Sequence, residues 1–241
     1  VDSDLSSSFS QFHAFAADGT PAGPEIPLDS GKMVSGVEPD IDREPRLIEL
    51  DGGGFAAVWL SGETFLPHDP VDIYLQTFDA DTVVGPFRAN MEFNDLLRLD
   101  ADIAQLGDGR LFVAWSVEGQ DVPPDANNPT GVYGRLFNLD GTPAGAEFRV
   151  TDAPVDGQAL PRMTTLADGG VVVSWLAYGR DPGDSVSENG VYAQIYNADG
   201  SERGGEFRVV PETPNGYELH QELIGTQDGG FVAIWWDSGQ F

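Results

Sequence analysis

One phrase recurs four times along the chain: a turn containing Asp and Gly, then a short apolar run that ends on Trp. The copies are LDGGGFAAVW at 50–59, LGDGRLFVAW at 106–115, LADGGVVVSW at 166–175 and TQDGGFVAIW at 226–235. Their tryptophans follow one another at intervals of 56 to 60 residues. A period of that size with strands inside it indicates repeated supersecondary units, which bury their apolar faces by stacking on neighbours.

Each repeat divides into four short strands. The first ends just before the Asp-Gly turn, the second is the apolar run, the third has the form GVYAQIY (190–196) and the fourth the form EFRV (206–209). Asp-Gly and Gly-Gly pairs supply the positive φ angles that tight hairpins need. The second strand is apolar on both faces, so we expect it to be covered on both faces, with its Trp in the blade core.

The two ends of the chain complement each other. Only six residues follow Trp235, so the last repeat lacks its third and fourth strands, and the N-terminal segment carries their pattern in SFSQFHAF (8–15) and AADG (16–19). We therefore predict one all-β domain over 1–241, a four-bladed β-propeller whose N-terminal strands complete the last blade. The repeats span about 31–90, 91–150, 151–210, and 211–241 with 1–30. An open array of small β-domains or a solenoid is the alternative.

The composition excludes several kinds of partner and site. Forty acidic and twelve basic residues give a formal charge of −28, and a surface of that sign repels nucleic acid and anionic membranes while attracting cations. The sequence has no cysteine, so neither disulfides nor thiolate metal sites exist. No apolar run approaches about 18 residues, and we expect no membrane insertion.

The repeat resembles a known group of proteins. LADGGVVVSW, a following GRD or GQD loop, GVYAQIYNADG and GGEFRV are similar to tandem repeats of very large secreted bacterial surface proteins, many of which carry RTX calcium-binding nonapeptides and leave by type I secretion. The resemblance covers nearly the whole chain and implies secreted or cell-surface localisation in calcium-rich surroundings. It supplies no catalytic residues, and the nonapeptide GGxGxDxUx is absent from this sequence.

In a propeller the first strand of each blade lines a central channel, so equivalent positions form rings. Alignment on the Asp-Gly turn predicts one ring of alternating charge at Arg46, Asp102, Arg162 and Glu222, and a second ring nearer the channel mouth at Glu44, Asp100, Leu160 and His220. One interpretation is a neutralised salt-bridge cluster. The other is a ligand pocket in which arginines hold a carboxylate or sugar hydroxyls. The ligand-binding candidates are Glu44, Arg46, Asp100, Asp102, Arg162, His220 and Glu222.

Two further rings follow from the same alignment. The ring expected to plug the channel consists of Ile48, Ala104, Thr164 and Ile224. The ring expected on the opposite face, in the blade core, consists of Leu47, Ile103, Met163 and Leu223.

Acidic loops between the second and third strands are candidates for a cation site. Asp121, Asp125, Asp181 and Asp184 carry the oxygen ligands that Ca²⁺ prefers, on turns rich in Gly and Pro. Their spacing does not match an EF-hand loop, and solvated loop acids are the alternative interpretation. We name calcium as the candidate cofactor.

The sequence favours a non-enzymatic binding or adhesion module of a secreted or surface protein, with a glycan, protein or small-molecule ligand at the channel mouth. No GxSxG, P-loop or GxGxxG motif is present. We therefore expect no enzymatic activity. The first alternative is a carbohydrate-active hydrolase or lyase that uses mouth carboxylates such as Glu44 with Asp100. The second alternative is a structural spacer.

Overall fold

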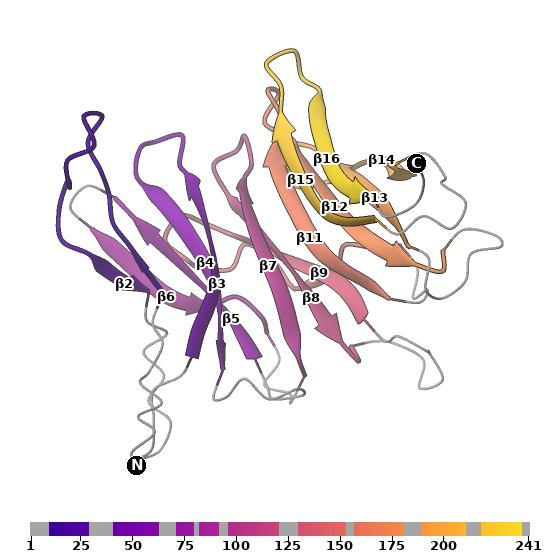
Figure 1. Cartoon of the computed structure of the whole chain (residues 1–241), viewed down its shortest axis with the longest axis horizontal. Helices are drawn as coiled ribbons and strands as arrows, with labels where there is room; N and C mark the ends of the chain where they lie inside the picture. Colours follow the sequence, from indigo (N-terminus) through magenta and orange to yellow (C-terminus); the bar gives the residue numbers. More distant parts are fainter. Residues whose placement is uncertain are drawn as a thin grey trace.

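The structure is a computed structural model that describes residues 10–28, 41–62, 71–79, 82–91, 96–120, 130–152, 157–180, 189–210 and 218–237. Every regular element within these ranges is a β-strand, and the paired strands are all antiparallel (Figure 1). The predicted all-β class is confirmed. The described ranges contain no helix with the length and apolar character that crossing a membrane requires.

Three four-stranded sheets follow the repeats, and we call them the first, second and third blades. The first blade consists of β3 (Ile41–Glu49), β4 (Phe55–Gly62), β5 (Val71–Phe78) and β6 (Val83–Arg88). The second consists of β7 (Arg98–Gln105), β8 (Leu111–Glu118), β9 (Thr130–Phe137) and β10 (Phe148–Arg149). The third consists of β11 (Gln158–Thr165), β12 (Val171–Tyr178), β13 (Asn189–Tyr196) and β14 (Glu202–Arg208). Each blade is a meander of neighbouring strands, as the repeat predicts.

Two hairpins flank the blades. The N-terminal hairpin pairs β1 (Ser10–Phe12) with β2 (Ile26–Leu28), and the C-terminal hairpin pairs β15 (Glu218–Gly225) with β16 (Phe231–Asp237). They form separate two-stranded sheets at opposite ends of the row of blades (Figure 1). The structure therefore shows three complete blades and does not confirm the predicted fourth, because each hairpin is held by packing against a neighbouring blade rather than by pairing with the other hairpin.

The Asp-Gly turns close the hairpins as expected. Gly109 and Gly169 have φ angles of 90° and 81°, which only glycine adopts without strain. Asp168 Oδ1 accepts a hydrogen bond of 3.0 Å from the backbone N–H of Gly170, two residues ahead, which fixes the turn locally.

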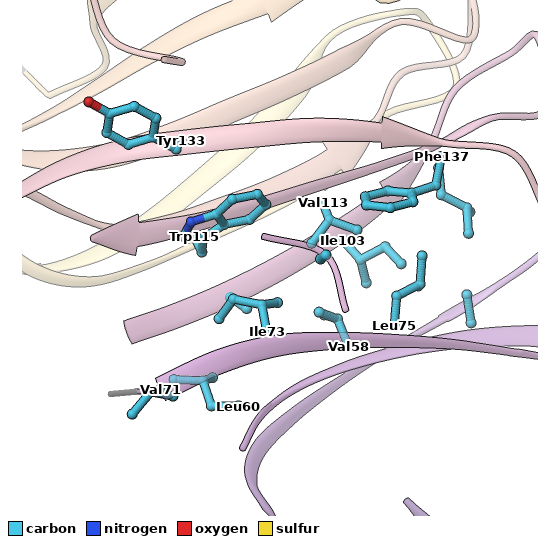
Figure 2. Packing of buried hydrophobic residues seen from close by; sticks show 14 of the residues in the cluster. Val58, Leu60, Val71, Ile73, Leu75, Ile103, Val113, Trp115, Tyr133 and Phe137 are labelled. Carbon is cyan, nitrogen blue, oxygen red and sulfur yellow. The ribbon is translucent and has the colours of Figure 1, made fainter. Parts of the chain in front are cut away.

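Blades stack face to face through apolar side chains. In the contact between the first two blades, Val58 and Leu75 pack toward Val113 and Trp115 of the second blade (Figure 2). The next contact repeats this arrangement with Phe112 and the third-blade Trp175. Trp59, Trp115 and Trp175 are fully buried, so their predicted place in the blade core is confirmed. The same prediction is wrong for Trp235, which is 38% exposed because its hairpin lacks the outer half of a blade.

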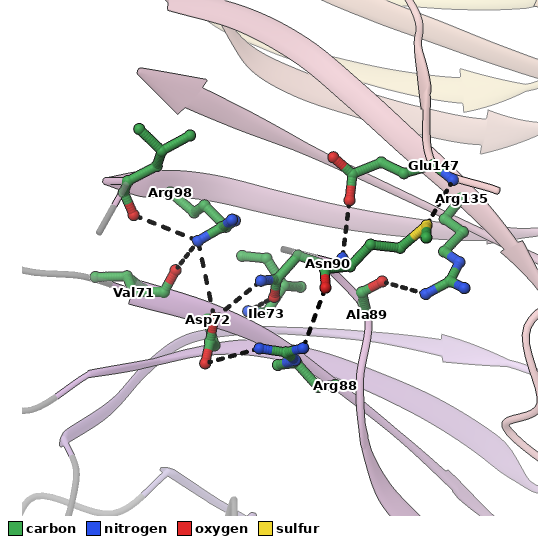
Figure 3. Close-up of polar contacts among 11 residues, drawn as sticks. Val71, Asp72, Ile73, Arg88, Ala89, Asn90, Arg98, Arg135 and Glu147 are labelled. Carbon is green, nitrogen blue, oxygen red and sulfur yellow. Dashed lines mark hydrogen bonds and ion pairs between the residues drawn. The ribbon is translucent and has the colours of Figure 1, made fainter. Parts of the chain in front are cut away.

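A polar network also joins the first two blades. The buried Arg98 of β7 donates to the Val71 carbonyl at 3.2 Å and lies 3.8 Å from the Asp72 carboxylate (Figure 3). Asn90 donates to Asp72 at 2.9 Å and accepts from the backbone N–H of Ile73 at 2.9 Å. The buried charge of Arg98 is therefore paired and hydrogen-bonded, as a buried cation requires.

Of the four expectations for the core ring, two are confirmed, one is confirmed in part and one is wrong. Ile103 and Met163 are buried between blades, and Leu223 packs, partly buried, against the third blade. Leu47, however, is exposed. It lies on the face of the first blade that a fourth blade would cover, where β15 and β16 do not pack.

We expect Trp175→Ala to lower the free energy of unfolding by about 3–5 kcal/mol, because the substitution leaves a cavity in the contact between the second and third blades. Leu139→Ala, at an exposed turn position, is the matched control and should change it by less than about 0.5 kcal/mol. Urea unfolding measures both. Equal effects would contradict the assignment of this Trp as a blade-to-blade core residue.

Candidate functional site

A β-bulge interrupts the first strand of every blade at the same place. The register shifts lie between Arg43 and Arg46, and at the equivalent positions of β7, β11 and β15. Glu44, Asp100 and Leu160 sit in these bulges with φ angles of 52°, 51° and 58°. A non-glycine residue in this region costs on the order of 1–3 kcal/mol, and such strain concentrates at functional sites.

The bulges of the three blades line one cavity of about 270 Å³, which we call the mouth cavity. It is lined by Glu44, Pro45, Arg46, Asp100, Ala101, Leu160 and Arg162. The structure thus brings together four of the predicted ligand-binding residues, Glu44, Arg46, Asp100 and Arg162. Sequence alignment missed Pro45 and Ala101. The prolines at 45 and 161 were a usable signal, because Pro inside a strand pattern marks a bulge or an edge.

Asp100 is the most perturbed acid that lines the mouth cavity. Burial, with a smaller contribution from the neighbouring Glu44 carboxylate, raises the pKa of its carboxyl to about 6, although Arg162 and Arg46 oppose the shift. At pH values below about 6 this carboxyl holds a proton that it can donate. A buried acid beside a second carboxylate is the arrangement that separates acid and base roles in hydrolytic sites.

Asp102 has a different role, although its pKa is also raised to about 6, mainly by burial. Its Oδ2 accepts a hydrogen bond of 2.8 Å from the backbone N–H of Met163, and its Oδ1 accepts one of 3.0 Å from the N–H of Ile103. Both oxygens are therefore occupied, and one of these bonds joins β7 to β11. Asp102 positions the strands of two adjacent blades.

Glu222 joins both arginines of the predicted charged ring. Its Oε1 lies 3.5 Å from Arg162 Nε and 3.8 Å from Arg46 Nη1. Arg162 also donates to the Pro161 carbonyl at 2.7 Å. Three of the four members of the predicted charged ring therefore lie together, and they connect the first blade, the third blade and the C-terminal hairpin.

The remaining candidates lie outside what the structure describes. His220 belongs to β15, but its side chain is outside the described residues, as are the calcium candidates Asp121, Asp125, Asp181 and Asp184. Among the described residues, no group of three or more His, Asp or Glu side chains is placed to hold a metal ion.

A second cavity, of about 230 Å³, is lined by Ile48, Ala104 and Thr164 of the ring predicted to plug the channel. The fourth member of that ring, Ile224, is exposed. A larger cavity, of about 720 Å³, lies between the N-terminal hairpin and the first blade, with Phe12, Phe55 and Phe78 in its wall. The charged residue among those that line it is Asp79, whereas Glu49 and Asp51 line the cavity of about 230 Å³.

Several solved structures have a fold similar to that of this chain. No family model and no curated protein matches the chain. The Penicillium chrysogenum α-L-arabinanase complexed with arabinobiose is similar, with a TM-score of 0.53 and 14% identity, over 79% of this chain and 58% of that one. A Dyadobacter fermentans protein of unknown function is similar with a TM-score of 0.60 and 14% identity, over 83% of this chain and 63% of that one. The Bacteroides thetaiotaomicron endo-arabinase is similar with a TM-score of 0.50 and 13% identity, over 79% of this chain and 68% of that one. At these identities the likeness shows a β-propeller-like fold, and the chain spans about three fifths of the first two proteins.

The comparisons correct the functional expectation. A non-enzymatic binding or adhesion module, and the absence of enzymatic activity, were the interpretations that the sequence favoured. The similar structures that carry a named activity are an arabinanase and an endo-arabinase, which favour the carbohydrate-active alternative instead. The sequence analysis gave this activity only as an alternative, because the repeat motifs build blades and name no chemistry.

The raised pKa of Asp100 predicts how stability depends on pH. The folded protein binds this proton more tightly than the unfolded chain, whose Asp pKa is about 3.9. The stabilisation is therefore fully present below pH 4 and is lost as pH rises through about 6, a loss on the order of 3 kcal/mol. Urea unfolding between pH 4 and pH 7 should show this loss in the wild type and a smaller loss in Asp100→Asn. Glu49→Gln, an exposed acid at the other end of β3, is the control, and identical pH profiles for all three proteins would contradict the assignment.

Proposed function

We propose that the chain is a carbohydrate-active hydrolase whose active site is the mouth cavity. The observation that carries the proposal is the protonatable Asp100 beside Glu44 in a cavity at the channel mouth. Glycoside hydrolysis needs two carboxyl groups, one protonated and one ionised, on either side of the scissile bond. The fold shared with an arabinanase and an endo-arabinase supports a glycan substrate.

Asp100 is the general acid in this proposal. It donates its proton to the glycosidic oxygen as the bond from that oxygen to the anomeric carbon breaks. Its pKa of about 6 keeps the carboxyl protonated in a mildly acidic medium, whereas an ordinary Asp would be ionised there. Asp102 is excluded from this role because backbone N–H groups occupy both of its oxygens.

Glu44 is the partner carboxylate. It is exposed in the cavity, close enough to Asp100 to raise the pKa of that group electrostatically. As a carboxylate it accepts the proton of the water that attacks the anomeric carbon, so one water is consumed for each bond cleaved. Proton transfer by positioned side chains contributes about 10²–10⁴-fold to a rate.

Arg46 and Arg162 form the substrate-binding side of the cavity. Their guanidinium groups present fixed N–H donors, and Glu222 holds both in place. Donors in such a fork bind sugar hydroxyls or a carboxylate on the substrate. We assign substrate orientation to these two residues.

We also propose the finer features that the sequence predicts. The ring has four blades, supported by the contact of Glu222 with Arg46 of the first blade. The protein acts outside the cell, supported by the resemblance to repeats of secreted bacterial proteins. Calcium binds the loops that carry Asp121, Asp125, Asp181 and Asp184, supported by their oxygen ligands.

For calcium, we expect the melting temperature to rise when the ion is added to chelator-treated protein, because an ion that binds the folded state stabilises it. Thermal melts in EDTA and in excess CaCl₂ measure this, with MgCl₂ as the control cation. An identical melting temperature in all three media would contradict the calcium proposal.

For catalysis, we expect Asp100→Asn to lower kcat on arabino-oligosaccharides by about 10²–10⁴-fold, because the amide cannot protonate the leaving group. Reducing-sugar release measures the rate, first on arabino-oligosaccharides and then on a panel of other plant and bacterial glycans. In the wild type, kcat/KM should fall as pH rises above about 6. Glu49→Gln should keep full activity. Activity retained in Asp100→Asn, or none on any glycan of the panel, would overturn the proposal.

A further inference from the structure

Large apolar side chains are exposed along one gap in the molecule. Ile234, Trp235 and Trp236 of β16 are 64%, 38% and 53% exposed, and Leu47 of β3 is 57% exposed. The tryptophans equivalent to Trp235 in the three complete blades are fully buried. Ile234 and Trp236 lie on one face of β16 and Trp235 on the other, since side chains alternate along a strand. Exposed large apolar side chains on the face of Ile234 and Trp236 mark a site that another surface covers.

The complete blades show what normally covers these positions. Ala56, Val58 and Leu60 of the first blade pack toward Ile103 of the second. The repeat makes Val232, Ile234 and Trp236 the equivalents of these three residues, and Leu47 the equivalent of Ile103. The face of β16 is therefore apolar at the same three positions that, in the first blade, pack toward Ile103, and its expected partner is Leu47.

The N-terminal hairpin has the register of the outer two strands of a blade. Phe12 of β1 pairs with Ile26 of β2, as Leu75 pairs with Phe87 in the first blade and Ala193 with Phe207 in the third. The turn repeats as well, because the bridge from Phe15 to Pro21 matches the bridge from Phe137 to Pro143. The hairpin is thus an outer half-blade without its inner half.

The N-terminal hairpin also occupies the place of an outer half-blade. Phe12, Ile26 and Leu28 pack on Trp59 of the first blade. Leu75 and Ala89 of the first blade pack in the same way beside Trp115 of the second. The C-terminal hairpin, through Leu223 and Phe231, packs on the third blade as an inner half-blade. Each hairpin therefore already packs on its neighbouring blade in the position of a half-blade.

The contact across the channel indicates whether the gap is filled by the N-terminal hairpin of the same chain or by that of a second copy. Glu222 of β15 lies 3.8 Å from Arg46 of β3, so the C-terminal hairpin and the first blade already meet at the axis within one chain. A second copy would have to insert its own first blade between these two groups. The N-terminal hairpin of the same chain requires no such insertion.

We propose that the free edge of β16 is a strand-docking site whose occupant is β1 of the same chain. The register is set by the complete blades, in which Trp175 pairs with Tyr192 and Val171 with Tyr196. Transferred to the hairpins, it pairs Phe231 with Phe15, Ala233 with His13 and Trp235 with Gln11. Docking joins two strand edges that pair with no other strand in the part of the chain that the structure describes. It also buries the face of β16 against Leu47, which removes an aggregation-prone edge.

A disulfide tests this register, because the chain has no cysteine of its own. We expect His13→Cys with Ala233→Cys to oxidise to an intramolecular disulfide in full-length protein, detected by non-reducing electrophoresis and intact mass. The positive control is Ala57→Cys with Gln76→Cys, the equivalent pair within the first blade. The negative control is His13→Cys with Val232→Cys, since a shift of one residue turns the side chain to the other face.

Each outcome decides the proposal. A cross-linked monomer for the first pair, with no cross-link in the negative control, supports it. A covalent dimer would overturn it in favour of pairing with a second copy. Free thiols in the first pair, while the positive control is oxidised, would show that the two edges stay apart. These readouts do not involve hydrolase activity, so this inference and the proposed function fail independently.

A charge placed on the docking face gives a second measurement. Ile234→Lys should lower the midpoint of urea unfolding and prevent the cross-link, because the docked face excludes water. Val83→Lys, at a position that is 52% exposed on the outer strand of the first blade, should leave the midpoint unchanged. Equal midpoints for the two variants would overturn the proposal.

Discussion

The packing of each blade's apolar face on the next blade is the interaction on which the rest of the structure depends. A repeat of about 60 residues cannot bury a strand that is apolar on both sides, so every blade needs a neighbour. Trp115 and Trp175 are buried for this reason. Where the neighbour is incomplete, between β16 and the first blade, Ile234, Trp236 and Leu47 are exposed. The need of each blade for a neighbour thus explains both the buried core and the exposed side chains at the gap.

This stacking also creates the candidate site. Because the blades surround an axis, the bulges of their first strands converge, and residues far apart in the sequence such as Glu44, Asp100 and Arg162 line one cavity. Burial in that cavity raises the pKa of Asp100, while Glu222 balances the arginines. The strained φ angles of the bulge residues are sustained by the surrounding sheet.

Much of this arrangement was predictable from the repeat. Alignment on the Asp-Gly turn predicted the strands, the buried tryptophans and the ring that joins Arg46, Arg162 and Glu222, because equivalent positions in a repeat have equivalent environments. It could not predict that Leu47 is exposed, because this exposure depends on the positions of the two hairpins relative to the first blade. Nor could it separate Asp100 from Asp102, since the difference lies in backbone hydrogen bonds between blades. The proposed hydrolase activity was only an alternative at the sequence level, because hydrolysis needs only carboxylates, which are abundant in this sequence.

The most direct test of the account is the ionisation of Asp100 itself. A ¹³C-detected NMR titration of the side-chain carboxyls, assigned with Asp100→Asn, measures the pKa of this group in the folded protein. The account predicts a midpoint near pH 6, set by burial and by Glu44. A midpoint near the ordinary Asp value of about 3.9 would contradict it, because the mouth cavity would then hold no general acid at neutral or mildly acidic pH.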